Sequence, residues 1–186
     1  KKGTTGLIEW NSYLGNTNTE HGGQVLEMHD GGFVLIGDRD LLGNGDSDIW
    51  LVKTNSVGDS LWTRSFGGPE PEHGYDIILN EDGGFILLGS TESFGNGGAD
   101  IWLIKTDANG QEEWDETFGG SSTDLGTYVE QTLDGGYIIA GRTESFGNGG
   151  SDVWVIKTDP NGFEEWNQIF GGSNNDYGWS VQQTND

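Results

Sequence analysis

The sequence repeats itself every 52 residues, and this periodicity constrains the fold more than any other feature of the chain. Four sets of residues recur at that spacing, and no insertion or deletion interrupts them. They are Trp10, Trp62, Trp114 and Trp166; Trp50, Trp102 and Trp154; Lys53, Lys105 and Lys157; and Gly22, Gly74, Gly126 and Gly178. A long fixed period indicates a repeat architecture, in which each copy buries its apolar faces against its neighbours.

Each copy contains four short apolar runs that are rich in β-branched and aromatic residues and bounded by Gly, Asn or Asp. Such runs are typical of strands and too short for helices. In the third copy the expected strands are 127–132, 136–142, 152–158 and 164–170. The Asp134-Gly135 pair predicts a type I′ hairpin turn, and the run from Asp159 to Gly162 predicts a second hairpin.

A four-stranded antiparallel sheet of about this length matches one blade of a β-propeller. The predicted fold is therefore all-β, a partial propeller of about 3.6 repeats that occupies residues 1–186 as a single domain. The blades are expected at about 23–66, 75–118 and 127–170, with a lone outer strand at 7–14 and a lone inner strand at 179–184. Because closed propellers have at least about four blades, we expect the partners to be other blades of a longer chain or copies of this one.

The repeat also predicts which side chains hold the blades together. Residues on the innermost strands are expected to be buried near the propeller axis: Val25, Ile77, Val129 and Val181. The third-strand tryptophans Trp50, Trp102 and Trp154 are expected between blades, and those of the outer strand partly exposed. The recurrent lysines are expected to pair with carboxylates, since other basic residues are rare.

The charge of the chain restricts its partners. With 31 acidic and 8 basic residues the net charge is −23, which disfavours nucleic acid and anionic membranes. No apolar run approaches the roughly 20 residues of a membrane span, so no membrane insertion is expected. The absence of cysteine excludes disulfides and thiolate metal sites. A composition this acidic suits a secreted or salt-exposed protein, or one that binds Ca²⁺.

The stretch "FGGSSTDLGTYVEQTLDGGYIIAGRTESFGNGGSDVWVIKTDPNGFEEW" resembles the bacterial and archaeal β-propeller repeat family often called SBBP repeats. The likeness covers essentially the whole chain, and the first copy departs most from the pattern. Similar repeats occur in large secreted or surface-anchored proteins, so the resemblance implies a propeller fold and an extracellular or cell-surface location. It implies no defined activity and therefore no catalytic residue.

Acidic and aromatic residues near the crossovers between blades are the candidate site. Acids recur two residues before the recurrent glycine, at Glu20, Glu72, Asp124 and Asp176. Others precede the third-strand tryptophan, at Asp48, Asp100 and Asp152. Glu72, Asp124, Asp176, Asp100 and Asp152 are candidate ligands for Ca²⁺; alternatively the crossover acids are solvated loops, and the strand acids cap the adjacent loop. A ligand rim is expected at Phe94, Asn96, Phe146, Asn148 and Trp179. Of these, Trp179 alone departs from the repeat, because the equivalent positions hold Gly23, Tyr75 and Thr127.

Motifs that carry catalysis are absent from the sequence. It contains no nucleophile elbow, His-Glu-x-x-His motif or phosphate-binding glycine loop. His21 and His73 are replaced by Leu125 and Tyr177 in later copies, so they predict no histidine site. We expect no enzyme activity and no cofactor apart from Ca²⁺, and a structural, adhesive or binding scaffold. The alternatives are a lectin-like or Ca²⁺-binding module that takes glycans or surface proteins, and a fragment of a propeller enzyme whose active site lies in other blades.

Overall fold

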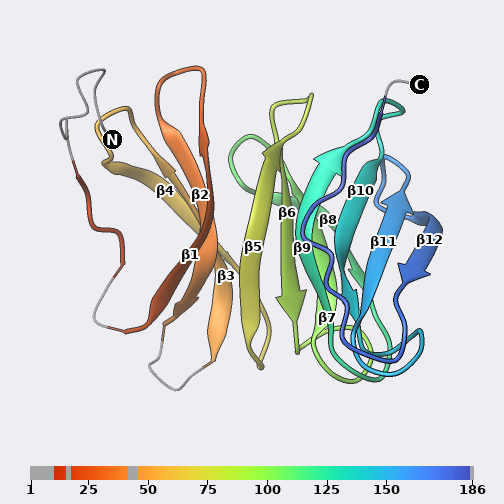
Figure 1. Cartoon of the computed structure of the whole chain (residues 1–186). Helices are drawn as coiled ribbons and strands as arrows, with labels where there is room; N and C mark the ends of the chain where they lie inside the picture. Colours follow the sequence, from red (N-terminus) through yellow and green to blue (C-terminus); the bar gives the residue numbers. More distant parts are fainter. Residues whose placement is uncertain (1–10, 16–17, 42–45, 185–186) are drawn as a thin grey trace.

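The computed structural model describes residues 11–15, 18–41 and 46–184, and all regular secondary structure in these segments is β-strand. The strands form three four-stranded antiparallel sheets, each made of consecutive strands paired in chain order (Figure 1). They are β1 (Glu20–Glu27), β2 (Phe33–Asp40), β3 (Ser47–Thr54) and β4 (Ser60–Phe66); β5 (Glu72–Leu79), β6 (Phe85–Thr91), β7 (Asp100–Thr106) and β8 (Glu112–Phe118); and β9 (Asp124–Gln131), β10 (Tyr137–Thr143), β11 (Asp152–Thr158) and β12 (Glu164–Phe170). Among the described residues, no helix has the length and apolarity to cross a membrane.

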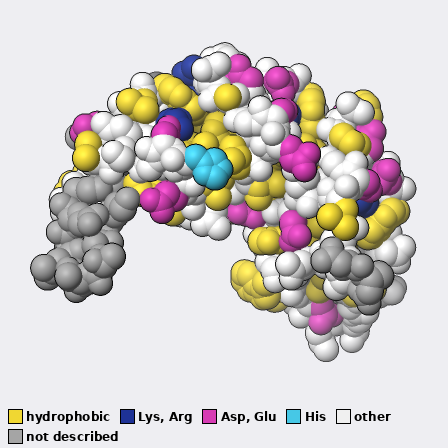
Figure 2. Space-filling model, turned by 90° about the horizontal axis from the view of Figure 1, so that it is seen from above, with side chains coloured by type: hydrophobic (Ala, Val, Ile, Leu, Met, Phe, Trp, Pro, Cys, Tyr) yellow, Lys and Arg dark blue, Asp and Glu magenta, His cyan; other side chains and the backbone are white. Residues whose placement is uncertain are grey.

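The three sheets pack face to face along an arc. β5 contacts β1, β2 and β3 of the preceding sheet, and β9 contacts β5, β6 and β7 in the same way. The first strands β1, β5 and β9 therefore stand next to one another (Figure 1). Seen from above, the molecule is curved and hollowed on one side (Figure 2).

The first strand of each sheet begins three residues earlier than expected, because the recurrent glycine belongs to the strand and not to the crossover loop. β9 starts at Asp124 and continues through a β-bulge at Thr127, and β5 has the same irregularity at Tyr75. A methyl group on Gly126 would lie 2.8 Å from a methyl carbon of Leu88. Glycine here permits close approach of two sheets. In the sequence such a glycine cannot be told from one that marks a turn.

The first hairpin turn is not type I′, which needs positive φ at both central residues. The Gly135 amide donates to the Thr132 carbonyl at 2.9 Å, and the Thr132 amide donates to the Gly136 carbonyl at 2.9 Å. Gly135 has φ 86°, and no described residue other than glycine has positive φ. The turn is therefore type I with glycine in the left-handed position that follows, and Asp134 keeps ordinary backbone geometry.

Two apolar clusters hold the sheets together, one in each interface. The first joins β2 and β3 to β5, β6 and β7 and contains Trp102, and the second joins β6 and β7 to the third sheet and contains Trp154. Both tryptophans are 3% exposed, as predicted. Ile77 and Val129 are also buried, as predicted.

The same positions behave differently at the first and last copies. Val25 is 50% exposed, and Trp50 and Val181 are half-buried, so the expectation that all copies bury these side chains was wrong. Val25 and Trp50 face away from the second sheet, and no other described sheet covers that side. Of the outer-strand tryptophans, Trp62 and Trp114 are half-buried and Trp166 is 45% exposed, whereas Trp10 lies outside the described residues.

The two lone strands expected at the ends are not observed as strands. Residues 11–14 form no strand, residues 7–10 lie outside the described part, and 179–184 form no strand either. The last segment nevertheless runs beside β9 (Figure 1), where an inner strand was expected. Side chains make the contact: the Thr127 hydroxyl donates to the Gly178 carbonyl at 2.8 Å, and the Gln183 side chain accepts from the Leu133 amide at 2.8 Å. Strand geometry needs a backbone ladder, and no described residue supplies one here.

Candidate functional site

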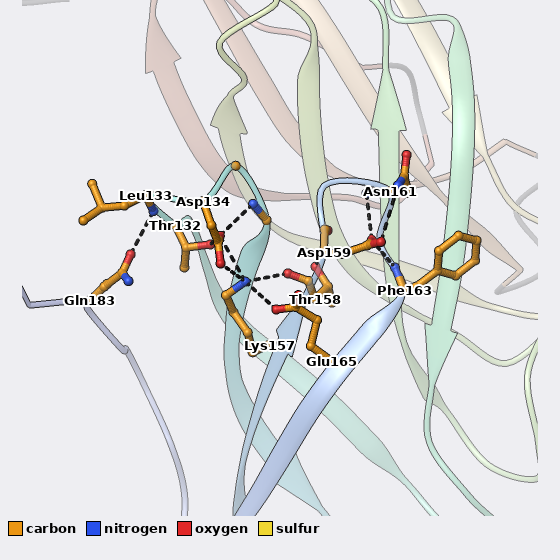
Figure 3. Close-up of polar contacts among 12 residues, drawn as sticks. Thr132, Leu133, Asp134, Lys157, Thr158, Asp159, Asn161, Phe163, Glu165 and Gln183 are labelled. Carbon is orange, nitrogen blue, oxygen red and sulfur yellow. Dashed lines mark hydrogen bonds and ion pairs between the residues drawn. The ribbon is translucent and has the colours of Figure 1, made fainter.

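The recurrent lysine is a structural ion pair, as predicted from the sequence. Lys157 Nζ lies 2.9 Å from Asp134 Oδ2 and 2.9 Å from Glu165 Oε2, and it donates to the Thr158 carbonyl at 2.8 Å (Figure 3). Lys105 makes the equivalent contacts with Asp82 and Glu113, both at 2.8 Å. Each lysine thus connects the two hairpins of its own sheet, and its ammonium group is not available to a ligand.

The neighbouring turns are held by aspartates, which settles their role. Asp159 Oδ1 accepts hydrogen bonds from the backbone amides of Asn161 at 2.8 Å and Phe163 at 3.0 Å (Figure 3). Asp107 makes the same pair of contacts in the second sheet. These aspartates shape hairpin turns, as the sequence predicted for the run from Asp159 to Gly162.

Replacing Lys157 with methionine is expected to flatten the acid side of the stability curve. Hydrogen bonds from Thr132 and Lys157 lower the pKa of Asp134 below its usual 3.8. A lowered carboxyl pKa contributes stability above the unfolded value, and this contribution is lost as pH falls through 3.8 towards the folded value. Urea unfolding should show a smaller loss of stability between pH 6 and pH 3 in Lys157→Met than in the wild type. Lys157→Arg, which keeps the charge, is the control, and parallel pH profiles for all three proteins would contradict the prediction.

The crossover acids are buried, so the solvated-loop interpretation is wrong for Glu72 and Asp124. Each is the first residue of its strand and is 0% exposed. Asp124 Oδ2 accepts from the Gly120 amide at 2.8 Å and from the Ser145 hydroxyl at 2.6 Å. Glu72 accepts from the Gly68 amide at 2.9 Å in the preceding junction. The crossover and the second-to-third-strand loop close over the carboxylate. The sequence alone would not suggest this, because Asp and Glu side chains are rarely fully buried.

Two of the acids before the strand tryptophans, Asp100 and Asp152, cap the adjacent loop with one oxygen and leave the other without a partner. Asp100 Oδ2 accepts from the Asn96 amide, and Asp152 Oδ2 accepts from the Asn148 amide at 2.7 Å. Both aspartates are 1% exposed. Asp100 Oδ1 and Asp152 Oδ1 are buried and accept no hydrogen bond within the described structure. The capping role is confirmed, but the second oxygen remains to be explained.

The two kinds of acid meet at a glycine of the crossover. A methyl group placed on Gly119 would lie 1.8 Å from Asp100 Oδ1 and 2.9 Å from Asp124 Oδ2, so the two oxygens converge on one point. The arrangement recurs at Gly67 and Gly171. We call these the carboxylate pairs: Asp48–Glu72, Asp100–Asp124 and Asp152–Asp176. The five acids expected to form a metal rim are thus divided among separate pairs, and no group of three or more His, Cys, Asp or Glu that could hold a metal occurs in the described residues.

In two of the carboxylate pairs, burial and the partner acid raise the pKa of the acid on the third strand. Burial raises the pKa of Asp100 and the charge of Asp124 adds to it, although the Asn96 amide acts in the opposite direction. Burial and the charge of Glu72 likewise raise the pKa of Asp48, and Arg39 opposes them. Two buried carboxylates that face each other create negative potential at the junction between successive sheets.

The expected aromatic rim is divided in space. Phe94 and Phe146 are each 43% exposed and rest against Trp102 and Trp154, with ring centroids 5.2 Å and 5.4 Å apart. Asn96 and Asn148 contribute their backbone amides to the aspartate caps described above. Trp179 is 75% exposed and lies elsewhere, in a groove that none of these four residues lines.

That groove lies between the first strands β5 and β9, β10 and the segment after β12. Its volume is about 530 Å³. It is lined by Tyr75, Leu125, Gly126, Thr127, Arg142, Tyr177, Gly178 and Trp179. The Arg142 guanidinium stacks 5.2 Å from the centre of the Tyr177 ring, and the Tyr75 hydroxyl lies 3.0 Å from Ser90 Oγ. We call this surface the aromatic groove.

The side chains of the aromatic groove come from positions where the copies differ. Tyr75, Thr127 and Trp179 are equivalents, and the first two occupy the bulge of their strands. A second variable position holds His21, His73, Leu125 and Tyr177. A third holds Asp38, Ser90 and Arg142. The sequence pointed only to Trp179. A position-by-position comparison of the copies would have revealed that all three positions vary, but only the structure shows that they are neighbours.

In the preceding junction the same positions form a charged cluster. His21 Nδ1 lies 3.0 Å from Asp38 Oδ2, and His73 Nδ1 lies 3.3 Å from Asp38 Oδ1. Burial raises the pKa of Asp38, but hydrogen bonds from His73 and His21 lower it overall. The hydrogen bond to Asp38 raises the pKa of His73. The expectation that the histidines form no set was therefore wrong for this pair, because Asp38 joins them across two sheets.

Comparison with known proteins gives one distant similarity. No family model matches the chain. The Regulatory protein FlaEY of Caulobacter vibrioides (strain ATCC 19089 / CIP 103742 / CB 15) is 27% identical over 182 residues, which covers 83% of this chain. The chain spans about a fifth of the length of that relative, 19%. It is thus similar to a segment of a longer protein.

Proposed function

We propose that this chain is part of a β-propeller that acts as an extracellular or cell-surface scaffold and binds a ligand in the aromatic groove, without catalysis of its own. One observation carries the proposal: the positions that hold the sheets together repeat, whereas the positions whose side chains line the groove vary from copy to copy. Binding residues on a rigid scaffold are free to vary where packing does not constrain them. The net charge of −23 supports a secreted or salt-exposed setting.

The propeller form is supported by the arrangement of the sheets. Consecutive four-stranded antiparallel sheets pack face to face along an arc, with the first strands β1, β5 and β9 adjacent to one another. Radial repetition of such sheets around an axis is the architecture of propellers. Grooves among the innermost strands of a propeller lie close to its axis, where side chains from several blades meet one ligand.

The lining of the groove favours a neutral saccharide as ligand. Tyr177 and Trp179 present exposed rings, which offer flat apolar faces to the C–H face of a pyranose. Arg142 supplies hydrogen-bond donors for hydroxyl groups, and it is the only basic residue among those that line the groove. A negatively charged glycan would be repelled by a protein of net charge −23. A neutral glycan satisfies both the rings and the charge.

Binding should depend on Trp179 and Arg142. On an array of neutral and acidic oligosaccharides, the wild-type chain should bind neutral members. Calorimetry on the strongest of them should show that Trp179→Ala or Arg142→Gln lowers the affinity about fivefold or more, because each removes a contact worth roughly 1 kcal/mol or more. Matched controls are Trp166→Ala and Arg64→Gln. Trp166 is also exposed, and Arg64 also stacks on a ring, that of Trp62 at 5.3 Å, but neither lines the groove.

Two results would contradict the proposal. One is the absence of binding to any neutral oligosaccharide on the array by folded protein. The other is an equal loss of affinity in the groove variants and the control variants, which would indicate a general effect on the fold.

A further inference from the structure

We infer that the carboxylate pairs Asp100–Asp124 and Asp152–Asp176 each bind a divalent cation, with Ca²⁺ as the ion that fits their chemistry. The inference is independent of the aromatic groove, because no residue of these pairs lines it. It concerns the junctions between successive sheets, where the third strand of one sheet meets the start of the next.

The unpartnered oxygens are the first observation. Asp100 and Asp152 are each 1% exposed, and the Oδ1 atom of each is buried with no hydrogen-bond donor. A buried ionised oxygen without a partner costs free energy, and a second carboxylate beside it raises the cost. Asp124 Oδ2 is that second oxygen in one pair, and Asp176 Oδ2 in the other. Asp124 Oδ2 and Asp176 Oδ2 each accept a hydrogen bond from a crossover amide, that of Gly120 at 2.8 Å and that of Gly172 at 3.1 Å, so the oxygens left without a partner are Asp100 Oδ1 and Asp152 Oδ1.

The Asp48–Glu72 pair supplies the second observation, because there the chain places an arginine opposite the third-strand acid. Arg39 lies opposite Asp48 in the β2–β3 register, and its charge opposes the rise in the pKa of Asp48 that burial and the charge of Glu72 cause. The equivalent positions hold Thr91 and Thr143, opposite Asp100 and Asp152. Asp48 has no unpartnered buried oxygen. Asp100 and Asp152, the third-strand acids without an arginine opposite them, are thus the ones with an unpartnered buried oxygen, as expected if a positive charge is required there.

The donor set selects the class of ion. Both partners of each pair are carboxylates, and the chain has no cysteine. Hard oxygen donors favour Ca²⁺ or Mg²⁺ over Zn²⁺. Ca²⁺ accepts six to eight oxygens in irregular geometry, whereas Mg²⁺ demands a near-ideal octahedron. With two carboxylates in each pair, backbone carbonyls and water would complete the shell, and we expect a Kd on the order of 10⁻⁴–10⁻³ M, as in extracellular calcium modules.

A cation at these positions would connect successive sheets. Asp100 begins β7 in the second sheet, and Asp124 begins β9 in the third. Asp152 begins β11, and Asp176 lies in the segment that follows the third sheet. Bound Ca²⁺ would therefore stabilise the packing of the sheets, so thermal unfolding should report binding directly.

The first experiment measures the Tm of the whole chain in EGTA, in CaCl₂ and in NaCl at the same ionic strength. With two sites of Kd about 10⁻⁴ M, we expect 10 mM CaCl₂ to raise the Tm by roughly 10–20 °C over NaCl. Equilibrium dialysis should give two Ca²⁺ per chain, one for each pair without an arginine. An unchanged Tm together with no bound Ca²⁺ would overturn the inference.

Substitutions separate a cation site from a structural role. Asp100→Asn should remove one bound Ca²⁺ and reduce the Tm increment, while leaving the Tm in EGTA unchanged or higher, because it relieves repulsion with Asp124. Asp107→Asn is the matched control, since both oxygens of Asp107 have partners within the hairpin turn, and it should keep the full Ca²⁺ increment. If Asp100→Asn lowers the Tm equally with and without Ca²⁺, the carboxylate is a structural cap only.

A gain of binding provides the sharpest test. Arg39→Thr gives the first copy the residue found in the other two. It should raise the stoichiometry from two Ca²⁺ per chain to three, and it should lower the Tm in EGTA but not in CaCl₂. A stoichiometry that stays at two would contradict the role assigned to Arg39. If the Tm in EGTA instead rises steadily as pH falls below 6 and Ca²⁺ has no effect, a proton occupies the pairs and the cation inference is wrong.

Discussion

Replacing Trp102 with alanine is expected to lower the free energy of unfolding by about 3–5 kcal/mol, as large aromatic truncations in cores do. The ring is 3% exposed and packs in the interface between the first two sheets. Its Nε1 donates to Asp115 Oδ2 at 2.8 Å, and Phe94 rests against it. Alanine would leave a cavity in the interface and take the donor from Asp115. Urea unfolding followed by circular dichroism measures the loss.

Two other tryptophans provide comparisons for this prediction. Trp50 occupies the same repeat position but is half-buried, so Trp50→Ala should cost clearly less than Trp102→Ala. Trp166 is 45% exposed, and its truncation should cost about 1 kcal/mol or less. Equal losses at Trp50 and Trp102 would mean that the ring stabilises its own sheet and not the interface between sheets, which would contradict the packing described here.

The isolated chain is expected to self-associate through the two end faces of its row of sheets. Phe170 is 57% exposed, although its equivalents Phe66 and Phe118 are 7% exposed in the two interfaces. Val25 shows the same contrast at the other end, as described above. Because the repeat makes the two end faces complementary, a second copy of this chain is the occupant we propose, in a head-to-tail arrangement. The net charge of −23 opposes association at long range, so added salt should promote it.

Light scattering tests this expectation at micromolar concentrations. The mass should exceed the 20.1 kDa of one chain, and Val25→Glu combined with Phe170→Glu should reduce it towards that value. Leu133→Glu is the control: Leu133 is 79% exposed on a hairpin turn and belongs to neither end face. A stable wild-type monomer at high salt would contradict the proposal, as would equal dissociation by the control.

The sequence by itself determined the parts of this protein that depend on local pattern. The 52-residue period, the apolar runs and the Asp-Gly turns predicted four strands per copy, and the structure has them at nearly those residues. Burial of Trp102 and Trp154 and the ion pairs of Lys105 and Lys157 were also predicted. These features follow from strand alternation and from the scarcity of basic residues, both of which are visible without knowing what lies across a junction between sheets.

Only the tertiary structure decided which residues from different copies meet. The recurrent glycine proved to be part of a bulged strand, and its lack of a side chain matters because Leu88 of the preceding sheet packs against it. In the sequence, Asp100 is a candidate loop cap and Asp124 a crossover acid. Face-to-face packing of the sheets brings an oxygen of each beside Gly119. The aromatic groove likewise combines variable positions of different copies. Period and alternation describe each sheet along the chain, whereas these sites depend on distances between sheets, which the packing of side chains sets.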